Sequence, residues 1–98
     1  MTGRIHDAVW QYIEAVPTGP TTKLMLVAIA VFPNSTARQL ATITHTSEVQ
    51  TERILLNIRR EALVIQTTAQ VDGKWRGVHR LDVETIERCT RIAAFAAE

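Results

Sequence analysis

The sequence predicts a mainly α-helical fold with one small β-hairpin, an α+β domain that takes in residues 1–98. Two helix-start signals lie about eleven residues apart, at Thr36 and Ser47. An Asp72-Gly73 pair lies between the segments LVIQTTAQV and KWRGVHRLDV, which is typical of a hairpin turn. Apolar residues recur at helical spacing towards both ends of the chain. We therefore expect helices on either side of a central motif and hairpin.

Two helices are expected before the motif. The apolar residues of the segment 4–16 fall on one stripe, and Trp10 lies outside that stripe, so Trp10 is either partly exposed or covered by a partner. Residues 21–32 form the second helix. Its core, LMLVAIAVF, has no polar side, so periodicity alone also allows a buried strand, but the flanking sequence favours a helix. A helix that is apolar all round must be covered on all sides.

The central residues predict two helices joined by a tight turn. Thr36 and Gln39 form a capping box that opens a helix over 36–43, and Ser47 and Gln50 repeat the arrangement at the start of a helix over 47–62. Residues 44–46 make the turn. The buried face of the second helix is expected to consist of Thr51, Leu55, Ile58 and Ala62.

A hairpin over 63–82 and a helix over 83–97 complete the chain. A two-residue turn at Asp72-Gly73, with positive φ at both positions, pairs Val64 with Leu81 at the base and Gln70 with Trp75 near the tip. Asp82 is placed to cap the last helix.

The motif residues follow the pattern of a known superfamily. The positions that fit are Thr36, Ala37, Arg38, Leu40, Ala41, Ser47, Arg53, Leu55, Leu63 and Val64. In these residues the chain resembles the winged helix-turn-helix superfamily, in particular small bacterial and phage regulators and the DNA-binding halves of plasmid replication proteins. The resemblance implies that the hairpin is a wing and that double-stranded DNA is the partner. The sequence departs from the pattern at His45, where relatives have glycine, and at Glu48 and Glu52, whose carboxylates repel phosphate.

The outward side of the helix over 47–62 is the part expected to enter a major groove. Gln and Asn side chains read adenine, Arg reads guanine, and Glu accepts a hydrogen bond from cytosine. The expected base-contacting residues are Glu48, Val49, Gln50, Glu52, Arg53 and Asn57. The alternative is a solvated helix face on which the glutamates complement the helix dipole.

The positive charge is concentrated in the second half of the chain. The net charge is only +1, but six Lys or Arg residues lie between positions 53 and 80 against two acidic residues. The residues expected to contact the DNA backbone are Arg38, Ser47, Arg59, Arg60, Lys74, Arg76, His79 and Arg80. The alternative for this set is an ordinary charged surface. Trp75 either stacks on a sugar or base or steadies the hairpin by packing across to Gln70.

The terminal helices are expected to form a homodimer interface. The closing segment IAAFAA is too apolar for a solvated helix of so small a domain, and its small residues allow close backbone approach. The residues expected in this interface are Trp10, Ile86, Ile92 and Phe95.

No catalytic set, metal site or cofactor is expected, so we do not expect an enzyme. His6, His45 and His79 lie on three separate elements. The single cysteine, Cys89, lies on an apolar stripe and has no intrachain partner, which suits a reducing compartment. The amino terminus lacks the apolar region of a secretory signal, and the run from Leu24 to Phe32 is too short to span a bilayer. We expect a cytoplasmic, nucleoid-associated protein with no membrane partner.

The function predicted from the sequence is sequence-specific binding of double-stranded DNA by a dimeric transcriptional regulator, a repressor of bacterial, plasmid or phage origin. Two alternatives remain open. In one, the fold is a protein–protein interaction module that docks a second regulatory protein through the acidic start of the second motif helix, with Val49 and Leu56. In the other, the protein is a plasmid or phage segregation or replication adaptor that binds repeated DNA sites.

Overall fold

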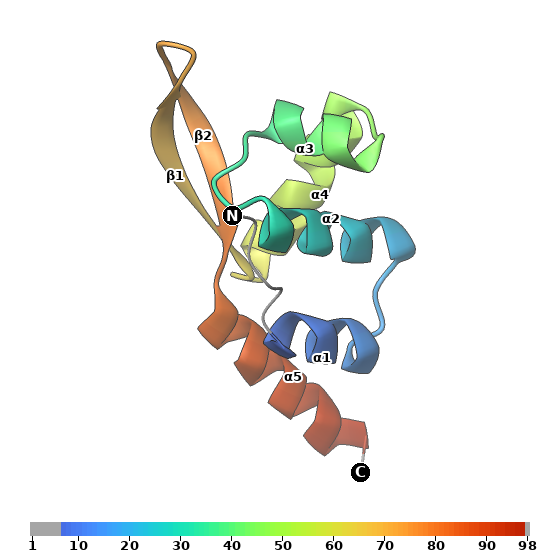
Figure 1. The fold of residues 1–98 in the computed structure, drawn as a ribbon. Helices are drawn as coiled ribbons and strands as arrows, with labels where there is room; N and C mark the ends of the chain where they lie inside the picture. The colour runs from blue at the N-terminus through green and yellow to red at the C-terminus, as the bar shows by residue number, and fades with distance from the viewer. Residues whose placement is uncertain (1–6, 98) are drawn as a thin grey trace.

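The computed structural model describes residues 7–97, in which five helices and one antiparallel hairpin follow one another (Figure 1). The elements are α1 (Asp7–Ala15), α2 (Pro20–Val31), α3 (Ala37–Thr44), α4 (Glu48–Arg60), β1 (Val64–Val71), β2 (Lys74–Leu81) and α5 (Val83–Ala97). The predicted α+β fold class and element order are confirmed. Residues 4–6 of the first predicted helix lie outside the described residues. No helix of the described chain is long and apolar enough to cross a membrane.

The helices form two ends joined by α2. At one end α1 packs along α5, and at the other α3 and α4 lie beside the hairpin, whose tip extends away from the helices (Figure 1). Helix α2 contacts α1, α3, α4 and β2, so it connects the two ends through side-chain packing. The molecule is elongated, with principal dimensions of 50 × 25 × 22 Å.

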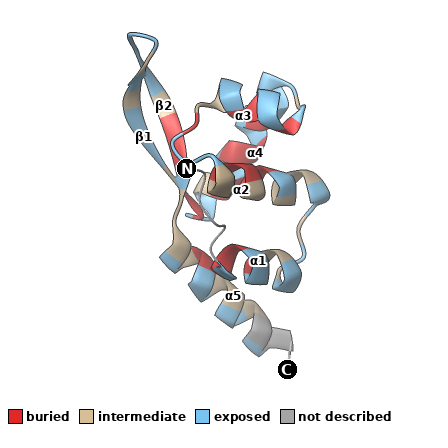
Figure 2. Cartoon of the chain, in the orientation of Figure 1, coloured by how far each residue is buried: buried red, intermediate tan, exposed pale blue. Residues whose placement is uncertain are grey.

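The hydrophobic core runs along the inward sides of all five helices and includes the base of the hairpin (Figure 2). Its fully buried large side chains include Met25 and Ile29 of α2, Leu40 of α3, Leu55 of α4 and Ile86 of α5. Ile86 was expected in a dimer interface, and that prediction is wrong, because its side chain is 1% exposed inside a single chain. Helix α2 is also less covered than expected, since Leu24 remains 48% exposed and Phe32 41%.

The helix boundaries differ from the predicted ones by one or two residues. Helix α2 begins at Pro20, because proline suits the first turn, where its missing N–H has no acceptor to lose. Helix α4 ends at Arg60 rather than at residue 62, since Ala62 has a left-handed φ of 61°. Ala62 is therefore exposed and does not extend the buried face of α4, whereas Ile54, which we did not place on that face, is buried.

The hairpin has the predicted register. Val64 pairs with Leu81 at the base and Gln70 with Trp75 near the tip. Asp72 and Gly73 have φ values of 54° and 76°, as a two-residue turn of this kind requires. On its other edge β2 forms one isolated bridge, between His79 and Ser35, so the connection from α2 to α3 lies against the hairpin.

Candidate nucleic-acid interface

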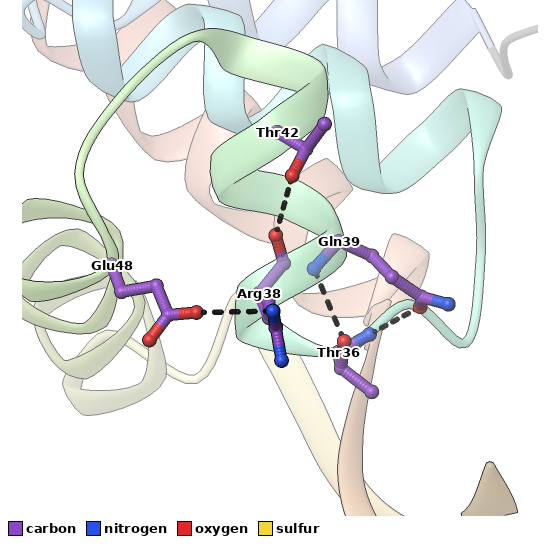
Figure 3. A network of polar contacts seen from close by, with 5 residues as sticks. All are labelled: Thr36, Arg38, Gln39, Thr42 and Glu48. Carbon is purple, nitrogen blue, oxygen red and sulfur yellow. Dashed lines mark hydrogen bonds and ion pairs between the residues drawn. The ribbon is translucent and has the colours of Figure 1, made fainter. Parts of the chain in front are cut away.

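Helix α3 is fixed at both ends by local hydrogen bonds. The Thr36 hydroxyl accepts from the Gln39 backbone N–H at 3.1 Å, and the Gln39 side-chain oxygen accepts from the Thr36 N–H at 2.9 Å (Figure 3). This reciprocal capping box was predicted. At the other end His45 has a left-handed φ of 56° and its N–H closes the helix, so a histidine occupies the turn position where glycine is usual.

Helix α4 begins with a simpler cap. The Ser47 hydroxyl accepts from the Gln50 N–H at 3.1 Å, whereas the reciprocal bond from the Gln50 side chain is not among the contacts of the described residues. Because Ser47 is committed to this bond, its side chain has a structural role at the helix start. The Gln50 side chain is free of the cap and lies on the exposed surface of α4.

A chain of threonine hydroxyls joins the turn to both motif helices, which the sequence analysis missed. The Thr44 hydroxyl donates to the Leu40 carbonyl at 2.8 Å and lies 2.9 Å from the Thr46 hydroxyl, which in turn lies 2.6 Å from the hydroxyl of Thr51. Thr51 has no exposed surface. These bonds fix the orientation of α4 relative to α3, which decides where the outward face of α4 points.

All six residues expected to contact bases are exposed on α4, and Leu56 is exposed beside them. Val49 is 68% exposed and Leu56 is 42% exposed. The buried side of the helix is formed by Thr51, Ile54, Leu55 and Ile58. The helix is therefore amphipathic, and the structure leaves the whole expected reading face available to a partner.

A groove lies between this face of α4, the start of α3 and the hairpin. We call it the binding groove. It brings together residues from three elements: Thr36, Ala37, Arg38, Gln39, Glu48, Glu52, Leu55, Leu56, Arg59, Gln66, Val71, Asp72, Lys74, Arg76, Gly77 and His79. Its cations are Arg38, Arg59, Lys74 and Arg76, and its carboxylates are Glu48, Glu52 and Asp72. Positive charge therefore reaches the groove from the helices and from the hairpin.

Glu48 and Arg38 form an ion pair at the mouth of the binding groove. Arg38 Nε lies 3.6 Å from Glu48 Oε1, and the two side chains are 87% and 57% exposed (Figure 3). At such exposure the pair contributes little to stability. Its effect is on the electrostatics of the groove, because one carboxylate offsets the charge of the guanidinium nearest the start of α4.

His79 was expected to contact the DNA backbone, and the structure corrects that prediction. Its side chain is 4% exposed, and Nδ1 lies 3.2 Å from the backbone oxygen of Ser35. Burial lowers the pKa of the imidazole below its usual value of 6.5, the bond to Ser35 opposes that shift, and the nearby charge of Arg59 adds to it. A buried neutral ring is unsuited to a phosphate. The predicted hairpin register could have revealed this burial, since alternation places His79 on the same face of β2 as Leu81.

The remaining expected backbone contacts are spread around the groove. Arg59, Lys74 and Arg76 line it, whereas Arg60 and Arg80 are exposed outside its lining. Arg53, which was expected to contact bases, is also exposed outside the lining. By strand alternation Arg80 lies on the same face of β2 as Lys74 and Arg76, but near the base of the hairpin, where it pairs with Ile65. The structure therefore brings together three of the predicted hairpin and α4 cations and separates the other three.

The described residues contain no group of three His, Cys, Asp or Glu side chains placed to hold a metal ion. Cys89 is a half-buried free thiol that packs against the core from α5.

The comparison with known proteins concerns the fold. No protein-family model and no curated protein matches the sequence. Among solved structures, the crystal structure of a MarR family transcription regulator superimposes with a TM-score of 0.63 at 19% sequence identity, covering 93% of this chain and 60% of that chain. This chain thus spans about three fifths of the length of that protein. The likeness confirms the winged helix-turn-helix fold, in which the β1–β2 hairpin is the wing.

Proposed function

We propose that this protein binds double-stranded DNA sequence-specifically and regulates transcription as a homodimer, acting as a repressor. The observation that supports this best is the binding groove, in which Glu48, Glu52 and Leu56 from the exposed face of α4 and two cations of the wing surround one space. A helix of this kind enters the major groove with its first turns, and the wing then lies over the neighbouring backbone. The structural neighbour has a similar fold and is described as a transcription regulator.

In this proposal the exposed residues of α4 and the cations of the binding groove have different roles. The side chains that reach base edges are Gln50, Glu52, Arg53 and Asn57, with Val49 against a thymine methyl group and Glu48 at the helix start. The cations Arg59, Lys74 and Arg76 neutralise phosphates and supply affinity that falls as salt rises. Arg38 joins them when DNA displaces it from Glu48.

The dimer is proposed to form through α1 and α5. These helices pack together at the end of the molecule away from the wing, and they leave Trp10 45%, Ile92 63% and Phe95 80% exposed (Figure 1). Large exposed apolar side chains on two adjacent helices of a small domain are typical of an interface. A twofold axis at this end would direct two α4 helices at two half-sites.

The first test is selection of bound sequences from random duplex DNA with the purified protein, followed by titration of the selected duplex at two salt concentrations. We expect a repeated motif and a steep salt dependence. Replacing Arg76 with Ala should weaken binding to every sequence and reduce the salt slope by about one. Arg88→Ala is the matched control, because Arg88 is equally a surface cation but lies on α5, outside the binding groove. Selection that enriches no sequence would contradict the proposal.

A second function, docking of a regulatory protein, is favoured by one specific observation. The start of α4 presents the exposed apolar side chains Val49 and Leu56 beside the carboxylates of Glu48 and Glu52. Such a surface suits a protein partner that offers both apolar and basic side chains. Val49→Ser separates the two functions. Loss of a protein partner with unchanged selection of DNA would favour docking, and a changed DNA preference would favour base contact.

A further inference from the structure

Trp75 stands near the tip of the wing without a packing partner of its own size. Its side chain is 69% exposed. Gln70 lies directly opposite it on β1, and the next residue of β2 on the same face is Gly77, which has no side chain to offer. The hairpin register is specified by the Asp72-Gly73 turn. The exposed indole therefore adds little to the stability of the hairpin.

The wing tip has two different faces. Lys74 and Arg76 flank Trp75 in the sequence, and because side chains alternate along a strand they lie on the opposite face of β2 from Trp75. Lys74 and Arg76 line the binding groove, and Trp75 is not among the residues that line it. The cations on one face attract phosphates. The indole on the other face is apolar and does not attract them. The second face suits an apolar surface such as the sugars and stacked bases of nucleic acid.

The dimensions of the wing limit where it can enter a duplex. Neighbouring strands lie about 4.8 Å apart, and the minor groove of B-form DNA is roughly 6 Å wide. Only the tip of a two-stranded ribbon fits such a space. Trp75 is the one aromatic side chain in the described hairpin, and it lies two residues past the turn. Apolar side chains that enter the minor groove partly unstack a base step, and aromatic rings stack on the exposed base.

We propose that Trp75 is a wedge that enters the minor groove of duplex DNA and packs against a base step beside the bases that α4 contacts. This inference rests on the proposed DNA-binding function. A wedge must open a step, so it favours the flexible pyrimidine–purine steps, which open at least cost. Cations without a wedge would instead favour an adenine tract as flanking sequence, because the narrow minor groove of such a tract concentrates negative potential. Trp75 thus selects flanking sequence without a hydrogen bond to any base.

The test compares two duplexes of equal length that carry the same selected site, flanked in one by an alternating thymine–adenine sequence and in the other by an uninterrupted adenine tract. Both have the same charge and base composition, and they differ in flexible steps. We expect the full-length wild-type protein to bind the alternating duplex at least about fivefold more tightly, Trp75→Phe to retain part of that preference, and Trp75→Ala to lose it. Trp75→Lys should increase affinity for both duplexes and also lose the preference.

Fluorescence gives a readout independent of affinity. The chain has two tryptophans, Trp10 and Trp75, so the Trp75→Phe variant reports Trp10 alone and the difference from wild type reports Trp75. We expect the Trp75 emission to be quenched when the alternating duplex is added. A Trp75→Ala variant that keeps the wild-type preference, or an emission unchanged by DNA, would overturn the wedge.

The remaining outcomes separate this inference from the proposed function. Binding of both duplexes without any dependence on Trp75 overturns the wedge and leaves the DNA-binding function intact. Failure to bind either duplex overturns both. A Trp75 emission that changes with protein concentration in the absence of DNA would assign the indole to a contact between copies of the chain, and would likewise overturn the wedge.

Discussion

His79 connects two parts of the chain that are distant in sequence. Its backbone N–H donates to the Ser35 carbonyl at 3.0 Å, and its own carbonyl accepts from the Asn34 N–H at 2.9 Å. Because a carbonyl only accepts, Nδ1 of the imidazole carries the hydrogen that points at Ser35. The residue before α3 is thereby held against the wing, so His79 fixes the width of the binding groove rather than contacting its ligand.

His79 is expected to make stability depend on pH. Burial lowers its pKa in the folded state below the unfolded value of 6.5, so the unfolded chain binds the proton more readily. The stabilisation is fully present above pH 6.5 and is lost as pH falls from there towards the folded pKa. We expect the thermal midpoint to fall between pH 7.5 and 5.5 by less in His79→Gln than in wild type. His45→Asn, at an exposed turn position, is the control and should follow wild type. Parallel pH profiles for wild type and His79→Gln would contradict this account.

Glu48 is expected to limit non-specific affinity. Its carboxylate neutralises Arg38 and repels phosphate at the mouth of the binding groove. Glu48→Gln should therefore increase binding to random-sequence duplex and steepen the salt slope by about one, while reducing discrimination between duplexes. The matched control is Glu84→Gln, because Glu84 also pairs with an arginine, Arg88 at 3.9 Å, but on α5. Equal effects of the two substitutions would show that only net charge matters, and not the position of Glu48.

At the scale of the elements, the sequence predicted the features that depend on residues close together in the chain, namely the turn of the wing and the helix caps. The wing register follows from Asp72 and Gly73, which alone adopt the two positive φ values of the turn. The capping box at Thr36 likewise depends on residues three apart. By contrast the bridge between Ser35 and His79 joins residues 44 positions apart, and no local pattern specifies it. The early end of α4 was not predictable either, because Ala62 adopts a left-handed φ and alanine is not a residue type that indicates such a position.

The candidate site was predictable to a similar extent. Helical periodicity identified the exposed face of α4, because it depends only on spacing within one helix. Which cations meet in the groove depends on how the wing lies against α4, and Arg53, Arg60 and Arg80 were not distinguishable from Arg59 and Arg76 by sequence.

The threonine chain of the motif gives a prediction at this scale. Thr51→Val conserves shape but removes the hydroxyl that lies 2.6 Å from Thr46 inside the buried face of α4. We expect a loss of about 1 kcal/mol in the free energy of unfolding, measured by urea denaturation. Thr42→Val is the control, since the Thr42 hydroxyl likewise makes one hydrogen bond, which it donates to the backbone oxygen of Arg38, but Thr42 is exposed (Figure 3). A cost for Thr42→Val as large as that for Thr51→Val would argue against a special role for the buried chain.

At the scale of the whole molecule, the two ends of the elongated chain have different surfaces. The end that carries the wing and α4 is charged, with four cations and three carboxylates in one groove. The end formed by α1 and α5 exposes aromatic and branched side chains. Because α2 joins the ends through the core, in the proposed dimer a change in how the two copies meet at one end would alter the spacing of the grooves at the other.

The dimer makes this relation measurable. Phe95→Glu places a charge on the most exposed large apolar side chain of the described residues, and we expect the variant to scatter light as a monomer where wild type scatters as a dimer. Its affinity for a duplex with two half-sites should fall about a hundredfold, while its affinity for a single half-site stays unchanged, because the binding groove is untouched. Gln11→Glu, which adds the same charge to an exposed polar position of α1, is the control. A wild-type protein that is monomeric at micromolar concentration, or a Phe95→Glu variant that remains dimeric, would show that the chain associates elsewhere or not at all.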